Sequence, residues 1–370
     1  MDTMPEFESP PLLPLSRRAL MRRAAIAAAA LPAGASLLEA FSGTAAAAAA
    51  DTGTIVFNNY PGWIGKNELA AFAKKYPGDK VKMVTNATSS VAEVILQFKS
   101  GNFDVLLSDT TDSGQASAAG LLEKLDWSKI PNIKNVSANF RKAYPWGIPT
   151  DYGKVGIAYR PDIVGEKITS WHDLWRLAPK FSGRIVFINL ERDCLGSTLK
   201  YLGYSSNTTN AKQIEAAKKA VQKIKPHLQA FLNTNVGQGL VNGSTAIAMD
   251  WDYDVALLKQ KQPKIEWVAP KEGMHAYLEG FSVAKGPDHL EVIEKFLNFA
   301  LDPVQYADFV NTTGTAYVVP SASSHIKKYI STSPILKPSP AVLKRVEFDH
   351  YLGAKGTQLF DAAWQEVKAS

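Results

Sequence analysis

The sequence predicts an α/β protein built of two lobes, with a ligand cleft between them and a hinge of crossing segments. Short apolar runs typical of strands alternate with amphipathic helical segments from residue 51 onward. The alternation starts again after Pro145-Trp146-Gly147, and the chain is expected to cross back between the lobes near 281–283. The 370 residues are 46% hydrophobic and 21% charged, which provides enough apolar material for two cores.

Three strands separated by two helices are predicted at the start of the folded chain. The strands are expected at 54–57, 81–84 and 103–107. Apolar residues at i, i+3, i+4 and i+7 predict a helix over about 66–76, and a capping box at Ser90-x-x-Glu93 begins the second helix. The third strand runs directly into the polar stretch 108–112, at the strand end where open α/β sheets bind ligands.

The same alternation continues in the second half of the chain. Further strands are expected at 154–159, 184–188, 245–249 and 265–268. Ser170 is expected to cap a short helix through Trp175, and Asn210 to cap a long amphipathic helix. Helices around 288–301 and 303–311 follow the crossing segment. We expect one lobe to comprise 51–148 with about 280–316, and the other to comprise 149–279 with about 317–370.

Residues 1–50 are expected to be a signal peptide. The stretch 16–22 contains Arg17-Arg18 and resembles a twin-arginine export motif. An alanine-rich apolar run follows it, and the tract 45–50 offers small-residue cleavage sites. Pro32, Gly34 and Glu39 interrupt the apolar run, so a membrane anchor is not expected. The predicted location is therefore periplasmic or extracellular.

The charge of the chain argues against a nucleic-acid partner. The formal net charge is +6, but the basic residues are spread along the chain and form no block. A positive protein also does not attract cations by its overall charge. Any cation selectivity must therefore come from side chains within the binding site.

The sequence contains no pattern typical of a catalytic or metal site. The single cysteine, Cys194, has no nearby histidine and is expected to be a buried structural thiol. The six histidines show no metal-binding spacing, and nucleophile-elbow and phosphate-loop motifs are absent from the sequence. Asp250, Asp252 and Asp254 alternate, but without the glycine and terminal glutamate of a calcium-binding loop. We therefore expect a binding protein without catalytic residues, metal or cofactor.

Two aromatic–acid segments indicate what is bound. They are Trp251-Asp252-Tyr253-Asp254 and Tyr277-Leu278-Glu279. Carboxylates accept the N–H bonds of an alkylammonium ion, while aromatic faces cover its methylenes and attract its charge. The two segments together therefore predict a site for a small organic cation.

Four stretches of the chain carry a recognisable pattern, at 103–108 with 125–132, 169–175, 202–205 with 207–209, and 270–273. They resemble the periplasmic spermidine/putrescine-binding proteins of ABC importers, which are type II solute-binding proteins. The resemblance covers about 53–365. It implies two α/β lobes that close on a polyamine such as putrescine or spermidine, an ABC importer permease as partner, and a monomeric state.

The resemblance also implies which residues contact the ligand. These are Tyr60, Trp63, Ser108, Asp193, Trp251, Asp254, Tyr277, Glu279, Tyr317 and Asp349. The chain departs from the family pattern at Leu190, where spermidine-binding members carry an aspartate, and at Pro61 and Gly62, which replace polar or acidic residues.

Structural roles remain open for several of these residues. Trp251 could be a core aromatic, Asp193 a surface ion-pair partner, and Glu279 a hinge residue. Asp109 and Asp112 are expected to serve as a helix cap rather than as ligands. Three other cargoes are compatible with the same fold: a thiamine-like cation, an opine and ferric iron. An exported enzyme that uses carboxylates as acid and base is the alternative outside transport.

Overall fold

The computed structural model describes residues 53–85 and 91–370. The predicted export motif, the cleavage tract and Ser90 of the capping box lie outside the described residues. Among the described helices, none has both the length and the apolar character needed to cross a membrane.

Within the described part of the chain, eleven strands form one mixed sheet. The strands are β1 (Thr54–Asn58), β2 (Lys80–Val84), β3 (Val105–Asp109), β4 (Gly147–Tyr159), β5 (Ile185–Ile188), β6 (Leu228–Leu232), β7 (Ile247–Trp251), β8 (Glu266–Val268), β9 (Met274–Val283), β10 (Ala316–Tyr317) and β11 (Val346–Phe348). Eight of them follow the order β2-β1-β3-β9-β4-β7-β5-β6, while β8 and β10 pair with β4 and β11 pairs with β9. The outer pairs of this order are parallel, β9 and β4 are antiparallel to their neighbours in this order, and β11 runs parallel to β9.

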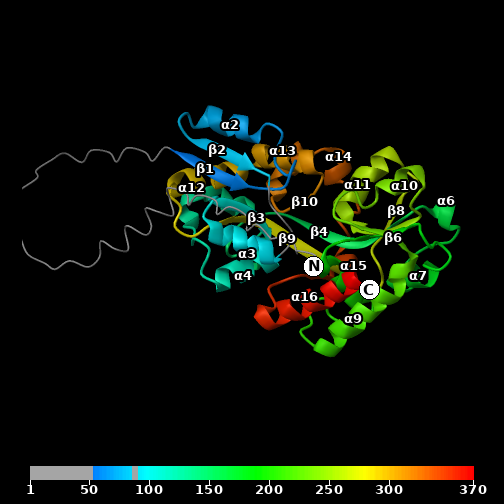
Figure 1. Cartoon of the computed structure of the whole chain (residues 1–370). Helices are drawn as coiled ribbons and strands as arrows, with labels where there is room; N and C mark the ends of the chain where they lie inside the picture. Colours follow the sequence, from blue (N-terminus) through cyan, green and yellow to red (C-terminus); the bar gives the residue numbers. More distant parts are fainter. Residues whose placement is uncertain (1–52, 86–90) are drawn as a thin grey trace, which may run out of the picture. The chain divides into compact units, whose positions relative to one another are not determined.

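The long strand β4 joins the two halves of the sheet, as Figure 1 shows. Its first part, from Gly147 to Lys154, pairs with β9, and its second part, from Val155 to Tyr159, pairs with β7 and β8. The sequence predicted only 154–159 because Pro149, Thr150 and Asp151 interrupt the apolar pattern. A register shift between Pro149 and Asp151 accommodates this interruption.

Helices connect these strands and cover the sheet. They are α2 (Glu68–Lys75), α3 (Val91–Ser100), α4 (Thr110–Ala118), α5 (Ala138–Ala143), α6 (Pro161–Val164), α7 (Trp171–Leu177), α8 (Glu191–Tyr201), α9 (Ala211–Ile224), α10 (Gln238–Asn242), α11 (Asp252–Lys261), α12 (Leu290–Ala300), α13 (Pro303–Thr313), α14 (Lys328–Ser331), α15 (Pro340–Leu343) and α16 (Gly353–Ala369). Short 3-10 turns lie at Trp127–Lys129, Pro131–Asn135, Lys225–His227 and Pro320–His325.

The predicted helix caps at Ser170, Asn210 and Asp109 are confirmed. The Ser170 side chain accepts a hydrogen bond from the Asp173 backbone N–H at the start of α7. The Asn210 side chain caps α9 in the same way, and Asp109 caps α4. Helices α8 and α11 were not predicted, because each begins with acidic residues that gave no clear apolar stripe.

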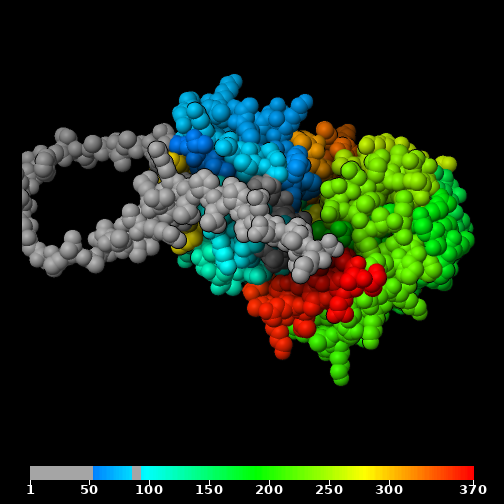
Figure 2. Space-filling view, viewed as in Figure 1, coloured from blue at the N-terminus to red at the C-terminus, as the bar shows by residue number. Residues whose placement is uncertain are grey.

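Two large hydrophobic cores lie within residues 51–370, which form one compact unit. The first core packs β1, β3 and part of β9 against α12 and α13, and it also receives apolar side chains from 318–336. The second core packs β5 and β7 with α7, α8, α9 and α16. In Figure 2 the red C-terminal helix α16 lies beside the green α9, and the Lys218–Glu366 ion pair joins them at 2.5 Å. Where one lobe ends and the other begins stays a prediction.

Cys194 belongs to the second core and is fully buried. Burial raises the pKa of its thiol above the ordinary value, which keeps the thiol protonated and unreactive. The prediction of a buried structural thiol is confirmed.

Candidate ligand-binding site

A cavity of about 400 Å³ lies between side chains that pack on the first core and side chains that pack on the second. Its volume is within the range typical of small-molecule sites. The acidic residues that line it are Asp109, Asp112, Glu191, Asp193, Asp254, Glu279 and Asp349. The aromatic residues that line it are Tyr60, Trp63, Trp251, Tyr253 and Tyr277. Its remaining walls are Pro61, Leu190, Arg192, Asn233, Thr234 and Asn235.

Strand ends place most of these side chains. Asp109 is the last residue of β3 and Trp251 the last residue of β7. Tyr277 and Glu279 lie on β9, which pairs with both β3 and β4. Polar and aromatic groups therefore gather beside the centre of the sheet. The apolar strands form the core there, and ligand-binding side chains lie at the strand ends and on the segments that follow them.

Eight of the ten residues predicted as ligand contacts line this cavity. They are Tyr60, Trp63, Asp193, Trp251, Asp254, Tyr277, Glu279 and Asp349. Ser108 and Tyr317 are not among the lining residues. Ser108 is buried in a hydroxyl network, with its Oγ 2.7 Å from Ser113 Oγ. The Tyr317 hydroxyl donates a hydrogen bond to Ser323 Oγ at 3.2 Å.

Three carboxylates stand side by side across the middle of the sheet. Glu279 on β9 is the direct register partner of Asp109 on β3 and of Asp151 on β4. Residues directly opposite each other in antiparallel strands share one face, and like charges there repel. Burial raises the pKa of Asp109 and of Asp151 to about 7. The pKa of Glu279 is raised well above its ordinary value by burial and then by Asp151 and Asp109.

The hydrogen bonds around this row compensate only part of its charge. Thr150 and Thr315 hydroxyls donate to the two oxygens of Asp151 at 2.9 and 3.0 Å. The indole N–H of Trp63 lies near Asp151 and Glu279 but has no hydrogen-bond partner among the described residues. The row therefore remains short of positive charge and of donors.

A second acidic pair lies at the start of α11. Asp250 is fully buried in β7, and Asp254 lies in the first turn of α11 on the cavity wall. The pKa of Asp250 is raised by burial and then by Asp254, and burial also raises the pKa of Asp254. The Gly237 backbone N–H donates to Asp254 Oδ2 at 3.5 Å.

The middle acid of the Trp251–Asp254 segment has a structural role instead. Asp252 forms a buried ion pair with Lys154 of β4, and both side chains are fully shielded from solvent. Helical spacing explains why Asp252 and Asp254 have different roles, because they are two residues apart and point to different sides of α11. Asp252 therefore has a structural role, and of this segment Trp251, Tyr253 and Asp254 line the cavity.

Asp193 is fixed between two ring systems. The Trp251 indole Nε1–H donates to Asp193 Oδ2 at 2.9 Å, and His275 Nε2 lies 3.2 Å from Asp193 Oδ1. His275 is fully buried on β9. Asp193 is thus neither a surface ion-pair partner nor a freely rotating group, and it holds the Trp251 ring against the cavity.

Arg192 is the one cationic side chain among the described residues that line the cavity, and its buried Nε has no hydrogen-bond partner in the described part of the chain. The Arg192 guanidinium lies over the Phe360 ring at 4.6 Å and donates to Asn207 Oδ1 at 2.7 Å. Within the described residues, no lysine or arginine forms an ion pair with any of the seven acidic lining residues. Arg192 therefore reduces the negative charge of the cavity without occupying its carboxylates.

Several lining residues were not predicted as ligand contacts. Asp109 and Asp112 were interpreted as a cap, and Asp109 is indeed one, but both also line the cavity. Their position at the end of a buried strand was the available signal. Tyr253 lies between the two expected contacts Trp251 and Asp254, and its ring stacks on Trp251 with centroids 5.9 Å apart. Glu191 and the stretch 233–235 gave no sequence signal.

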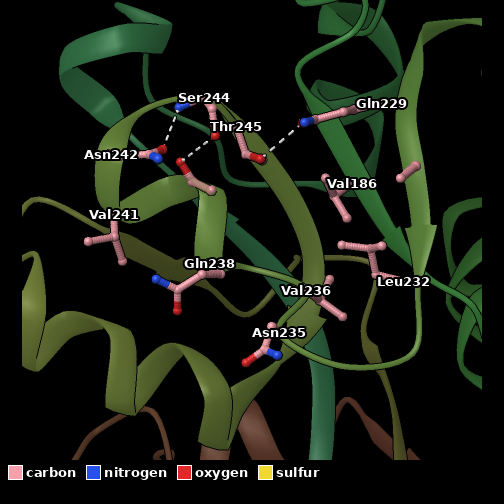
Figure 3. Close-up of a pocket in the computed structure, with 12 residues that line it drawn as sticks. Val186, Gln229, Leu232, Asn235, Val236, Gln238, Val241, Asn242, Ser244 and Thr245 are labelled. Atoms are coloured by element: carbon pink, nitrogen blue, oxygen red, sulfur yellow. Dashed lines mark hydrogen bonds between the residues drawn. The ribbon is translucent and has the colours of Figure 1, made fainter.

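A separate hollow of about 420 Å³ lies beside β6 and α10, as Figure 3 shows. The polar side chains that line it are uncharged amides and hydroxyls, such as Gln229 and Thr245, which hydrogen-bond each other at 3.1 Å. Because none of the described lining residues is acidic, this hollow lacks the chemistry expected for a cation. Among residues 53–85 and 91–370, no group of three or more His, Cys, Asp or Glu side chains is arranged to hold a metal ion.

Comparison with known proteins agrees with this architecture. The family model for bacterial extracellular solute-binding proteins matches residues 69–338. The spermidine/putrescine-binding periplasmic protein of Escherichia coli K12 is 28% identical over 336 residues, covering 88% of this chain and 95% of that protein. The putrescine-binding periplasmic protein SpuD of Pseudomonas aeruginosa is 24% identical over 345 residues, covering 87% and 94%.

A solved structure shares the fold. The substrate-binding protein PotD of the Streptococcus pneumoniae spermidine/putrescine ABC transporter superposes with a TM-score of 0.73, at 22% identity and with 85% of this chain and 98% of that chain covered. The predicted periplasmic-binding-protein-like α/β fold is confirmed, and so are a location outside the cytoplasm and a binding rather than an enzymatic role. The chain belongs to the family of bacterial extracellular solute-binding proteins.

Proposed function

We propose that this protein captures a polyamine outside the cytoplasmic membrane and delivers it to the permease of an ABC importer. The observation that carries the proposal is the charge of the cavity. Among the described residues, seven acidic side chains line it, against one arginine, Arg192, which lowers the pKa of Asp109 and of Glu191 without forming an ion pair with them. Relatives named for spermidine and putrescine support the same class of cargo.

The raised carboxyl pKa values follow from acidic side chains that lie close together in a buried site. Burial and mutual repulsion disfavour the charged forms of Asp109, Asp112 and Glu279. An ammonium group placed among them would reverse this shift, because an opposite charge favours the ionised carboxylate. Binding of a polycation would therefore release protons from the protein.

The aromatic lining suits the hydrocarbon part of a polyamine. Trp251 and Tyr253 stack with an interplanar angle of 18°, and Trp63 meets the Tyr253 ring edge-on at 5.2 Å. Each buried methylene contributes about 0.8 kcal/mol, and each cation–π contact about 0.5–2 kcal/mol. A neutral alkane diol of equal length would gain the first contribution but would leave the carboxylates unpaired.

The export route of the protein and the closure of its lobes on the cargo are part of the same proposal. The leader at 1–50 would direct export by the twin-arginine pathway, after which the protein acts as a monomer. Closure of the lobe 51–148 with about 280–316 on the lobe 149–279 with about 317–370 would enclose the cargo. Two separate hydrophobic cores and a cavity between their side chains support two lobes, while the packing of 318–336 on the first core favours a boundary after about 336 instead of at 317.

Isothermal titration calorimetry with a panel of ligands tests the proposal. Putrescine and spermidine are expected to bind and to raise the melting temperature, because a ligand specific for the folded state stabilises it. The neutral control 1,4-butanediol should do neither. Thiamine, an opine and Fe(III) represent the other cargoes compatible with the fold. Binding of one of these without binding of any polyamine would overturn the proposal.

A further inference from the structure

The long strand β4 changes its pairing partner at one residue, Lys154. Up to Lys154, which is the register partner of Ala276, β4 pairs with β9, and from Val155 onward it pairs with β7. Ile148 of β4 belongs to the first core and Val155 to the second, so the strand passes from one half of the sheet to the other here (Figure 1). A movement of one half against the other must therefore bend or twist the chain close to Lys154.

The Lys154 side chain is fully buried, and three groups surround its ammonium. Nζ forms the ion pair with Asp252, donates to the Leu336 carbonyl oxygen at 3.5 Å and lies 4.8 Å from the centre of the Tyr152 ring. An ammonium group has three N–H donors, and a carboxylate, a carbonyl and an aromatic face together satisfy them. Moving one of these groups away would leave a buried positive charge incompletely compensated, which is costly.

The partners of Lys154 come from both halves of the molecule. Tyr152 and Leu336 pack in the first core, whereas Asp252 directly follows Trp251 of the second core. The backbone N–H of Lys154 also donates to Asp252 Oδ1 at 3.2 Å. Lys154 thus holds together β4, the start of α11 and the backbone at Leu336.

Asp252 connects this contact to the cavity. It is the first residue of α11, and its Oδ1 accepts the Tyr253 backbone N–H at 2.9 Å. Trp251, Tyr253 and Asp254, which flank Asp252 in the chain, line the cavity. A contact outside the cavity therefore fixes the position of this cavity wall relative to β4.

We infer that Lys154 is a positioning residue at the pivot of the hinge, the point about which the two halves rotate when they close on a cargo. The link to cargo binding rests on the proposed function, but the pivot itself is a property of the free protein. Without the Lys154 contacts, the free protein would sample more arrangements of its two halves, and a smaller fraction would be competent to bind. The affinity for every cargo should then fall by the same factor, while the preference among cargoes stays unchanged.

The rival explanation is a buried pair that only stabilises the folded chain. Lys154→Met alone does not separate the two, because it leaves the Asp252 carboxylate buried without its partner. The double variant Lys154→Met, Asp252→Asn removes both charges, while the side chain at 252 keeps an oxygen for the backbone N–H groups of residues 154 and 253. The matched control Lys295→Met, Asp79→Asn removes a 3.3 Å ion pair between α12 and the residue before β2, away from β4.

Distances between the two halves of the free protein provide the first test. Val304 on α13 and Lys219 on α9 are exposed, so the substitutions Val304→Cys and Lys219→Cys would accept spin labels while the buried Cys194 stays unlabelled. Double electron–electron resonance without ligand should give a broader distance distribution in the double variant than in the wild type. The control variant should match the wild type. An unchanged distribution in the double variant overturns the inference.

Calorimetry on the same proteins tests the link to binding. Putrescine and spermidine should each bind the double variant about fivefold to twentyfold more weakly than the wild type, by the same factor for both ligands. Weaker binding with an unchanged distance distribution would reveal a local distortion of the cavity wall and would overturn the pivot. If the wild type binds neither ligand while the double variant still broadens the distribution, the proposed function fails and the pivot stands.

Discussion

The Trp251 indole N–H donates to Asp193 Oδ2 at 2.9 Å and so joins the end of β7 to the first turn of α8. This bond sets the orientation of an aromatic ring and of a carboxylate on the same cavity wall. A ligand that meets both groups therefore meets a preorganised surface, which costs less ordering on binding.

Removing this bond should weaken ligand binding more than it weakens folding. In Trp251→Phe the aromatic face remains but Asp193 loses a donor, and we expect a loss of about 1–3 kcal/mol in polyamine affinity. Calorimetry measures the affinity, and thermal denaturation measures the stability. Trp146→Phe, outside the lining residues, is the control and should keep wild-type affinity.

The cavity acids should be essential for affinity but not for folding. Glu279→Gln and Asp254→Asn are each expected to reduce putrescine affinity about tenfold to a hundredfold, since each removes a charged partner of an ammonium group. Glu279→Gln should also raise the melting temperature of the free protein, because Glu279 opposes Asp109 and Asp151 in register. Wild-type affinity in both variants would contradict a role for these acids.

The free protein should become less stable as the pH rises from about 5 to about 8. The pKa of Asp109 and of Asp151 is about 7 in the folded chain, above the ordinary value of 3.8. Between these two values the folded state holds more protons than the unfolded state, so stability is present at low pH and is lost as pH rises through the folded pKa. Urea denaturation at several pH values measures this slope.

A bound polyamine should offset part of the loss of stability that accompanies rising pH. A polyamine favours ionised carboxylates, so its affinity should increase across the same pH interval while its amines stay protonated. Calorimetry in buffers with different ionisation enthalpies counts the protons released on binding. Affinity that falls from pH 5.5 to 7.5 would be inconsistent with cargo held by these carboxylates.

The buried Lys154–Asp252 ion pair should contribute to stability rather than to ligand specificity. Lys154→Met leaves the Asp252 carboxylate buried without its partner, and we expect a loss of about 3–5 kcal/mol in the free energy of unfolding. Lys264→Met removes a solvent-exposed partner of Asp162 and should cost less than about 1 kcal/mol. Chemical denaturation compares the free energies of unfolding of the two variants. An equal loss in both would show that the buried pair contributes no more to stability than the exposed pair.

Much of the fold followed from local patterns in the chain. Strands such as β1 and β5 have continuous apolar runs, and the caps at Ser170 and Asn210 depend on residues only two or three positions away. Strand β4 was predicted only in part, because Pro149, Thr150 and Asp151 break the apolar run that the tertiary structure nevertheless buries. Local signals could not reveal a strand that is stabilised mainly by its neighbours.

The candidate site, like the fold, could be predicted from the sequence only in part. The aromatic and acidic chemistry could be predicted from the residue types alone, because Trp251, Tyr277 and Glu279 carry it wherever they are placed. The folded chain was needed to show that Glu279 stands between Asp109 and Asp151, that Asp252 pairs with Lys154, and that Ser108 lies in a hydroxyl network rather than on the cavity wall. The reason is that strand register and side-chain direction arise from contacts between segments far apart in the chain, which no short sequence window contains.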